Sequence, residues 1–248
     1  MKSVLKWGQI LCLVLTSYTI QAKTTRGAAS LEHQDEPLTL SEMQREIRLQ
    51  HARELLGKYY KTSAVHVGEN IGKINSQIYT WTRERLPKKY KAQYKRIAQT
   101  IIDESMKREF DPVFVLSVIQ NESSFNPTMK GSLDEIGLMQ LRPGTAKWIA
   151  EKFELKYKNS KTLLDPVENI RIGLAYMDYL RDSLPHARLY LSAYNMGKRN
   201  VQENMDRNVW PKEYASHVMR FYIEFYAQIK ERKGNKVAAL NHREAAGG

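Results

Sequence analysis

One segment of the chain, residues 111–127, reads DPVFVLSVIQNESSFNP. Asp followed by Pro is typical of a helix start, because the Asp side chain caps free backbone N–H groups and Pro fits the first turn. The residues from Val113 to Ile119 are almost all apolar. A helix that is apolar on every side has to be buried. The segment therefore predicts a helix through the middle of a folded domain, with Glu122 near its carboxyl end.

Similar helix signals recur along the chain. Asp165-Pro166 repeats the start signal, and Thr39 with Glu42 has the form of a capping box that opens a helix to about Tyr60. No segment shows the sustained alternation of polar and apolar residues that is typical of a strand. We therefore predict an all-α fold. Further helices are expected at residues 71–86, 88–110, from 143 onward, 165–180, 185–194 with Gly197 as terminator, and 210–232.

The ends of the chain differ from its middle in composition. Residues 1–22 have a basic start, a mostly apolar stretch at 7–20 and a small residue at Ala22, which is the pattern of a secretory signal peptide. The apolar stretch is shorter than the roughly 20 residues of a membrane-spanning helix, so an uncleaved anchor is the weaker alternative. We expect a periplasmic or secreted protein with no stable membrane span after cleavage. Residues 23–38 predict a flexible linker, 39–90 a helical extension, 91–232 the main domain, and 233–248 a flexible tail.

The composition limits the classes of site and partner. The chain has 248 residues, 39 Lys and Arg against 27 Asp and Glu, and a single Cys. Cys12 has no partner for an intramolecular disulfide, and no Cys and His group has zinc-site spacing, so we expect no metal and no cofactor. The net charge of +12 favours an anionic partner. No nucleic-acid motif accompanies this charge, so nucleic acid is not an expected partner.

Glu122 is the main candidate for chemistry. At the end of an apolar helix, the helix dipole and the loss of hydration both disfavour the charged form of a carboxyl group. We therefore predict a raised pKa, as general-acid catalysis near neutral pH requires. Taken alone, the pattern also fits a Glu122 that is simply a solvated side chain at the end of a helix. Most glycosidases need a second carboxylate, but the nearby Asp134 and Glu135 are interpreted as solvated loop residues, which leaves a substrate with an internal nucleophile as the natural choice.

Several short motifs occur in order from about Ile97 to Ile229. Together they resemble the catalytic domain of soluble lytic transglycosylases, the SLT domain, which is related to goose-type lysozyme. The motifs are Glu122-Ser123 with Asn126-Pro127, Gly137-Leu138-Met139-Gln140 with Pro143-Gly144-Thr145-Ala146, Leu164-Asp165-Pro166 with Asn169-Ile170, and Ala193-Tyr194-Asn195.

The resemblance implies a lysozyme-like helical domain that acts on peptidoglycan. Such an enzyme cleaves the β-1,4 bond between N-acetylmuramic acid and N-acetylglucosamine and leaves 1,6-anhydro ends. Glu122 would act first as acid and then as base. By the same resemblance, Met139 and Gln140 would contact the sugar, Tyr194 and Asn195 would line the cleft, and Ser123 would order the loop.

The chain departs from the family pattern at three places. Gly131 stands where a Ser is common, with Ser132 beside it as a possible substitute. Asp134-Glu135 replaces small residues and adds negative charge near the cleft, which would either raise the pKa of Glu122 further or alter the preference of the sugar subsites. The late Tyr-Val pair corresponds to His217-Val218, so His217 is a candidate polar lid on the site, with an ordinary surface His as the alternative.

Alternative functions remain open from the sequence. One is a hydrolytic lysozyme of the same fold, in which water captures the intermediate. Another is a non-catalytic wall-binding or assembly protein with a protein partner at residues 39–90. The expected partner of the leading hypothesis is the peptidoglycan glycan strand.

Overall fold

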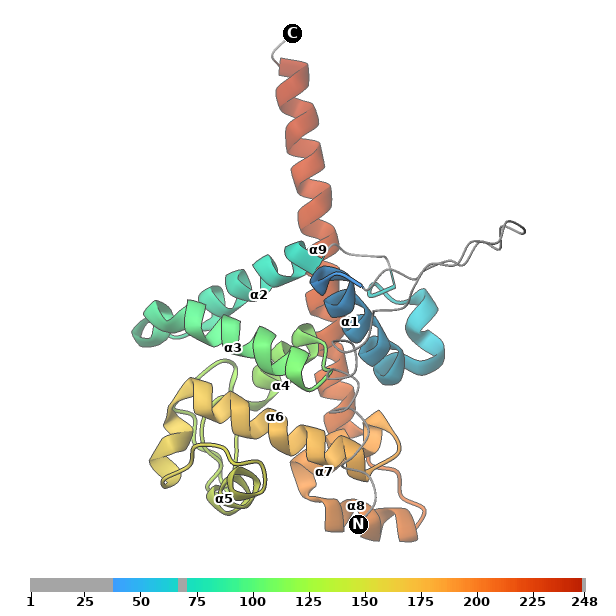
Figure 1. Ribbon diagram of the computed structural model, residues 1–248. Coiled ribbons are helices and arrows are strands. Elements are labelled where there is room, and N and C mark those ends of the chain that lie inside the picture. Colours follow the sequence, from blue (N-terminus) through green and yellow to red (C-terminus); the bar gives the residue numbers. More distant parts are fainter. Residues whose placement is uncertain (1–37, 67–70, 247–248) are drawn as a thin grey trace, which may run out of the picture. The chain divides into compact units, whose positions relative to one another are not determined.

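The computed structural model describes the backbone of residues 38–66 and 71–246, and the side chains of residues 38–66 and 74–229. The predicted signal peptide at 1–22 lies outside the described residues, as does the predicted linker except for Leu38. Within the described part the chain forms helices and no named strand, so the prediction of an all-α fold is confirmed (Figure 1).

The α-helices are α1 (Leu40–Leu56), α2 (Ile71–Arg85), α3 (Tyr94–Lys107), α4 (Pro112–Ser123), α5 (Pro143–Lys152), α6 (Pro166–Ser183), α7 (Ala187–Met196), α8 (Lys198–Asp206) and α9 (Glu213–Ala246). Three 3-10 turns separate some of them: η1 (Gly57–Thr62), η2 (Lys88–Gln93) and η3 (Ser160–Leu164).

Helix α4 forms the centre of the core, as its sequence predicts. Its residues from Val113 to Ile119 are buried, and it packs against α3 and along α9 (Figure 1). Asp111 is the N-cap of α4 and accepts a hydrogen bond of 2.8 Å from the Val113 N–H. Asp165 caps α6 in the same way, through the Val167 N–H. Both helix starts are therefore where the two Asp-Pro pairs predict them.

A buried polar network surrounds the start of α4. The Asp111 carboxylate also accepts hydrogen bonds from the hydroxyls of Tyr222 (2.7 Å) and Tyr226 (2.6 Å), both on α9. Arg48 on α1 is buried and donates to the Tyr226 hydroxyl at 3.1 Å. Burial lowers the pKa of His51, also on α1, and the neutral ring accepts the Asp111 N–H at 3.1 Å. The network ties α1 and α9 to the first turn of α4.

The helical extension predicted at 39–90 packs on the rest of the domain. Arg48 and His51 of α1 are buried, and Ile74, Ile78 and Trp81 of α2 form part of the same apolar core as α4. The Trp81 ring lies 4.8 Å from the Phe225 ring of α9 between centroids. These contacts give the extension a structural role, and a protein partner at this segment stays a prediction.

Some helix boundaries differ from the sequence predictions. Helix α1 ends at Leu56 and continues as a 3-10 turn, where the sequence predicted helix to about Tyr60. Helix α8 was not predicted, because it is mostly polar and Val201 is its only buried residue. Helix α9 begins at Glu213 and continues to Ala246, so the predicted end at Arg232 is wrong. One Gly234 among good helix formers costs only about 1 kcal/mol, too little to stop the helix.

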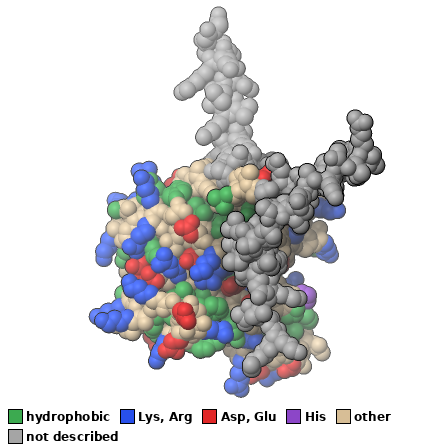
Figure 2. Space-filling view, viewed as in Figure 1, with side chains coloured by type: hydrophobic (Ala, Val, Ile, Leu, Met, Phe, Trp, Pro, Cys, Tyr) green, Lys and Arg blue, Asp and Glu red, His purple; other side chains and the backbone are tan. Residues whose placement is uncertain are grey.

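The surface carries mixed charge. Figure 2 shows Lys and Arg side chains spread over the face in view, interspersed with Asp and Glu. Such mixing is typical of a solvated surface, and it places no single basic stripe on this face. Among the helices that the structure describes, none combines the length and the apolar composition that crossing a membrane requires.

Candidate active site

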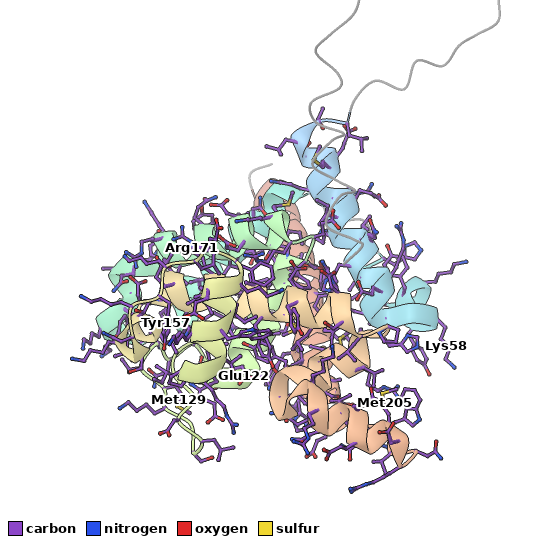
Figure 3. The ribbon with its side chains drawn as sticks, turned by 60° about the horizontal axis from the view of Figure 1, so that its bottom comes forward. Lys58, Glu122, Met129, Tyr157, Arg171 and Met205 are labelled. Carbon is purple, nitrogen blue, oxygen red and sulfur yellow. The ribbon has the colours of Figure 1, made fainter. Side chains whose placement is uncertain are left out.

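An open cleft of about 620 Å³ lies at the carboxyl end of α4. Its walls come from the end of α4, the loop between α4 and α5, and helices α5 to α8. Figure 3 shows Glu122 between the segment that carries Met129 and the helix that carries Met205. The lining residues are Glu122, Gly131, Ser132, Leu133, Glu135, Gln140, Leu141, Arg142, Thr145, Tyr176, Tyr194, Asn195, Met196, Gly197 and Asn200.

Glu122 has a perturbed carboxyl group. Burial raises the pKa of Glu122 to about 7, the hydroxyl of Tyr214 on α9 donates a hydrogen bond that partly opposes the shift, and the charge of Glu135 reinforces it. The final turn of α4 has no cationic residue that would favour the anion. A large fraction of Glu122 is therefore protonated near neutral pH, which gives the cleft a proton donor.

The loop between α4 and α5 is held against α6 by one side chain. Asn169 donates from Nδ2 to the carbonyls of Ile136 (2.8 Å) and Leu163 (2.9 Å), and its Oδ1 accepts the Met139 N–H at 2.8 Å. Gly137 fits beside it with a φ of +85°, and a Cβ there would lie 2.3 Å from Asn169 Nδ2 and 2.4 Å from the Leu163 carbonyl. Only glycine fits this position, since both the conformation and the space exclude a side chain.

Two further hydroxyl groups fix the same loop relative to Glu122. The Ser123 hydroxyl donates to the Leu138 carbonyl at 2.8 Å, and the Tyr194 hydroxyl donates to the Met139 carbonyl at 2.8 Å. Ser123 is buried next to Glu122 in the chain, so its bond links the end of α4 directly to the loop. The sequence resemblance implied this loop-ordering role.

Gln140 presents its carbonyl oxygen to the cleft. Its Nε2 donates to the carbonyls of Met129 (3.1 Å) and Gly137 (2.8 Å), which occupies both N–H groups of the amide. Its Oε1 lies beside Gly131, 3.0 Å from the point where a Cβ of that residue would stand. The side chain is therefore oriented to accept a hydrogen bond from a hydroxyl or amide group in the cleft.

Glu135 occupies the space that Gly131 leaves open. A Cβ at Gly131 would lie only 2.3 Å from Glu135 Oε2, so a Ser at this position is incompatible with this placement of Glu135. Glu135 Oε2 accepts the Leu133 N–H at 2.9 Å, and Oε1 pairs with Arg142 Nε at 3.1 Å. Partial burial favours the neutral form, but these bonds hold the pKa of Glu135 below its ordinary value. The carboxylate stays charged and fixed in the cleft wall.

The structure brings most of the predicted site residues together. Glu122, Ser132, Gln140, Tyr194 and Asn195 all line the cleft.

Three other predicted residues lie elsewhere. Ser123 is buried behind the wall, and the Met139 side chain is buried against Gly173 because an apolar side chain at the base of this loop gains most from the core. His217 is exposed on α9 and is not among the cleft-lining residues, so the expectation of a lid at this residue finds no support in the geometry.

Tyr214 is a site residue that was not predicted from the sequence. It lies on α9 three residues before His217, which is one helical turn, so it lies on nearly the same face. It is buried and reaches the Glu122 carboxyl group, whereas the position chosen from the family pattern points to solvent. A search for Tyr one turn away from the expected position would have found it. Thr145 lies in a motif quoted from the sequence but was not named as a site residue, and no local pattern marks Arg142, Tyr176 and Asn200.

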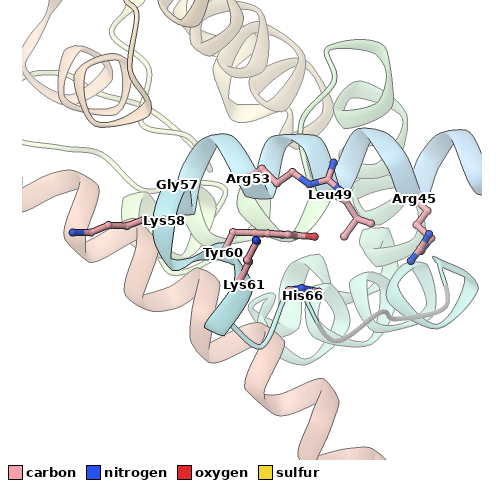
Figure 4. A pocket seen from close by; sticks show the side chains of 8 residues that line it. All are labelled: Arg45, Leu49, Arg53, Gly57, Lys58, Tyr60, Lys61 and His66. Atoms are coloured by element: carbon pink, nitrogen blue, oxygen red, sulfur yellow. The ribbon is translucent and has the colours of Figure 1, made fainter.

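A second cavity of about 580 Å³ lies over α1 and η1 (Figure 4). Its lining contains no carboxyl group, so it offers no acid for glycosidic chemistry. The lining residues are Arg45, Leu49, Arg53, Gly57, Lys58, Tyr60, Lys61 and His66. Within the described part of the chain, no group of three His, Cys, Asp or Glu side chains is arranged to hold a metal ion.

The fold and the site define an all-α domain with a protonatable carboxyl group in an open cleft. Residues 99–216 match the family model of the Transglycosylase SLT domain. This match covers a little under half of the chain, and it confirms the resemblance inferred from the motifs.

Curated relatives also match part of the chain. The soluble lytic murein transglycosylase of Escherichia coli K12 is 30% identical over 131 residues, which are 52% of this chain and 19% of that protein. The membrane-bound lytic murein transglycosylase C of Histophilus somni strain 2336 is 38% identical over 99 residues, 35% of this chain and 27% of that protein. The chain thus spans a minor part of the length of these relatives.

A solved structure is also similar. It is the X-ray structure of an inactive mutant of the lytic transglycosylase Slt from Pseudomonas aeruginosa. The matched region covers 75% of this chain and 37% of that chain, with 20% sequence identity and a TM-score of 0.49.

Proposed function

We propose that this protein is an exported peptidoglycan lytic transglycosylase. It cleaves the β-1,4 bond between N-acetylmuramic acid and N-acetylglucosamine and leaves 1,6-anhydro ends. The observation that carries the proposal is the Glu122 carboxyl group, buried at the end of α4 with a pKa of about 7 in a cleft of the SLT segment. The names of the relatives, which are lytic murein transglycosylases, support the choice of substrate.

In the first step Glu122 acts as acid. The protonated carboxyl group donates its proton to the glycosidic oxygen, and the bond between this oxygen and C1 of the muramic acid breaks. The acetamido group of the same sugar stabilises C1 from the substrate side, so the protein needs no nucleophile. Gln140 and Asn195 line the cleft, and in this reaction they hydrogen-bond the sugar.

In the second step the same residue acts as base. The Glu122 carboxylate takes the proton of the C6 hydroxyl, and O6 forms a bond to C1. The proton that left in the first step is thus restored, and no water is consumed. A pKa near 7 suits both roles, because the two protonation states have similar free energies near neutral pH. The Tyr214 hydroxyl hydrogen-bonds the carboxyl group in the meantime.

The state of Glu135 supports a mechanism with one carboxyl group. It is the other acid that lines the cleft, but both of its oxygens already accept bonds, from Arg142 and the Leu133 N–H. Its presence nevertheless makes a hydrolytic lysozyme the second candidate, because a carboxylate on the cleft wall is what activation of a water molecule needs.

The export of the protein is part of the proposal. Residues 1–22 have the pattern of a signal peptide, and the substrate lies outside the cytoplasm. The periplasm or the exterior is therefore the proposed location.

Product analysis tests the function. The purified protein is incubated with peptidoglycan, and the released fragments are weighed by mass spectrometry. We expect fragments that are lighter by one water than the hydrolytic products, with anhydro ends. Reducing ends in their place would identify a lysozyme, and no release at all would favour a non-catalytic role.

Glu135→Gln tests the electrostatic environment of the acid. Loss of the Glu135 charge lowers the pKa of Glu122, while the hydrogen bond from Tyr214 remains. Because the acid must be protonated, kcat/KM falls as pH rises through that pKa. We expect the alkaline limb of the kcat/KM profile to have its midpoint near pH 7 in the unaltered protein and lower in the variant.

The matched control is Asp134→Asn. Asp134 is the adjacent acid in the chain, but it is exposed and does not line the cleft. This variant also loses one negative charge, and we expect the alkaline limb of its kcat/KM profile to keep the midpoint of the unaltered protein. Equal shifts in the two variants would mean that overall charge, and not Glu135, sets the profile.

The stability of Glu122→Gln depends on pH. The pKa of Glu122 is 4.5 in the unfolded chain and about 7 in the folded one. The proton bound to Glu122 contributes its full stabilisation of the fold below pH 4.5. This contribution is lost as pH rises from 4.5 through 7. Gln carries no such penalty, so the variant is expected to be as stable as the unaltered protein at pH 4 and up to about 3 kcal/mol more stable at pH 8. Urea unfolding at both pH values measures this, and equal stabilities at pH 8 would contradict the burial cost.

A further inference from the structure

The cleft wall continues beyond the residues that line the cavity. Thr145 on α5 and Tyr176 on α6 line the cleft. Trp148 follows Thr145 by three residues on α5, and Tyr179 follows Tyr176 by three residues on α6. Each therefore lies one turn further along the same face of its helix. The rings of Trp148 and Tyr179 are in contact, with centroids 4.9 Å apart and an angle of 89° between their planes. Trp148 is 43% exposed, so the aromatic surface is open to solvent.

Two Lys side chains flank this aromatic surface. The ammonium of Lys152, on α5, lies 5.7 Å from the centre of the Tyr179 ring, and that of Lys198, at the start of α8, lies 5.8 Å from it. Neither ammonium has a carboxylate within ion-pair distance among the described side chains. Lys198 follows Gly197, which lines the cleft, so the positive charge adjoins the cavity. Two unpaired cations beside one ring favour an anionic group in the ligand.

A run of aromatic rings connects this surface to Glu122. Tyr214, which hydrogen-bonds Glu122, lies 6.5 Å from Tyr194 between ring centroids, and Tyr194 lies 5.3 Å from Tyr176. Tyr179 and Trp148 come one turn later on α6 and α5. The aromatic surface is therefore an outward continuation of the same wall that holds the candidate acid.

We propose that Trp148, Tyr179, Lys152 and Lys198 form an outer binding site for the glycan strand. A sugar ring packs its C–H face on the indole of Trp148, and a carboxylate of an attached stem peptide pairs with the ammonium groups beside Tyr179. The chemistry of the surface fits both parts of this ligand, because aromatic faces attract the positive edges of C–H groups and ammonium groups pair with carboxylates. This site rests on the proposed function for the identity of its ligand.

Binding without cleavage tests the site. The full chain carrying Glu122→Gln is titrated with purified peptidoglycan sacculi, and the dissociation constant is compared with that of the same protein carrying Trp148→Ala. We expect Trp148→Ala to weaken binding about tenfold, which corresponds to about 1.4 kcal/mol. Trp210→Ala is the matched control, because Trp210 is 50% exposed and lies outside the cleft lining, and it is expected to bind within about twofold of the parent.

The two Lys residues give an independent readout. Lys152→Met with Lys198→Met is expected to weaken binding to peptide-bearing sacculi about tenfold and to leave binding to glycan without stem peptides unchanged. Trp148→Phe keeps an aromatic face and is expected to retain most of the affinity. Equal binding by the Trp148→Ala and Trp210→Ala proteins would overturn the site. So would unchanged binding to peptide-bearing sacculi after both Lys substitutions.

The outcomes separate this site from the proposed function. If the unaltered protein releases no anhydro fragments but Trp148→Ala still weakens binding, the proposed function fails and the site stands. If anhydro fragments are released and Trp148→Ala changes neither binding nor the KM for long strands, the function stands and the site is refuted.

Discussion

Glu122→Gln is expected to lower the rate of glycan cleavage at least about 1,000-fold. The substitution keeps the size of the side chain and its ability to accept the Tyr214 hydrogen bond, but it removes the proton that the leaving oxygen needs. General acid–base catalysis by one group is worth about 10² to 10⁴ in rate, and Glu122 serves in both steps of the proposed reaction. Release of soluble fragments from peptidoglycan, followed over time, measures the loss.

The control for this prediction is Glu151→Gln. Glu151 is an exposed carboxylate on α5, outside the cleft lining, and its loss is expected to leave the rate unchanged. Binding of the Glu122→Gln protein to sacculi is expected to persist, since the other residues that line the cleft are unaltered. A Glu122→Gln protein that retained a tenth or more of the activity would show that another group supplies the proton.

Asp111→Ala is expected to cost about 3 to 5 kcal/mol of stability. Asp111 is fully buried, and its carboxylate accepts bonds from the Val113 N–H and from the hydroxyls of Tyr222 and Tyr226. Burial raises the pKa of Asp111, and the nearby Arg48 guanidinium opposes this shift. Removal of the carboxylate leaves buried donors without an acceptor and takes away a negative charge near Arg48, which is the costly way to break such a network.

Asp165→Ala provides a closely matched comparison. Asp165 caps α6 ahead of a Pro as Asp111 caps α4, with a bond of 2.9 Å to the Val167 N–H. Its side chain is 43% exposed and pairs with Arg96 at the surface. Loss of this cap is expected to cost only about 1 kcal/mol. Chemical unfolding of both variants gives the two values, and equal losses would mean that the buried network adds nothing beyond the cap.

The helical core was predictable because its signals are local. The Asp-Pro pairs at 111–112 and 165–166 and the capping box at Thr39 each specify a helix start within a few residues, and the structure has them all. The apolar run after Asp111 likewise required burial. Helix α8 lacked such a signal, because its position depends on contacts with α7 more than on an apolar stripe of its own.

The candidate site was predictable only in part. Glu122, Gln140, Tyr194 and Asn195 lie in motifs close to one another in the sequence and line one cleft in the structure. The contact of Tyr214 with Glu122 joins residues 92 positions apart, and it depends on the rotation of α9 against α4. No local pattern fixes such a rotation, which is why the family pattern pointed to His217, one turn away.

Glu135 was expected to be a solvated loop residue, but it lies in the cleft wall. Its sequence position in a polar loop favoured a solvated side chain. In the structure the backbone of this loop returns on itself, with Gly131 N–H donating to the Glu135 carbonyl at 2.9 Å, and the side chain enters the space above Gly131. The pairing with Arg142 at the start of α5 then holds it in the cleft wall. Loop geometry of this kind follows from several long-range contacts together.

Titration of the Glu122 carboxyl group in the full chain is the most direct test of a protonated acid in this cleft. Carbon NMR follows the side-chain carboxyl resonance against pH, and the Glu122→Gln protein identifies it by its absence. We expect a midpoint at about pH 7, as burial at the end of α4 requires. A midpoint near 4.5, the value of an unperturbed Glu side chain, would contradict the proposed role of Glu122 as a general acid at neutral pH.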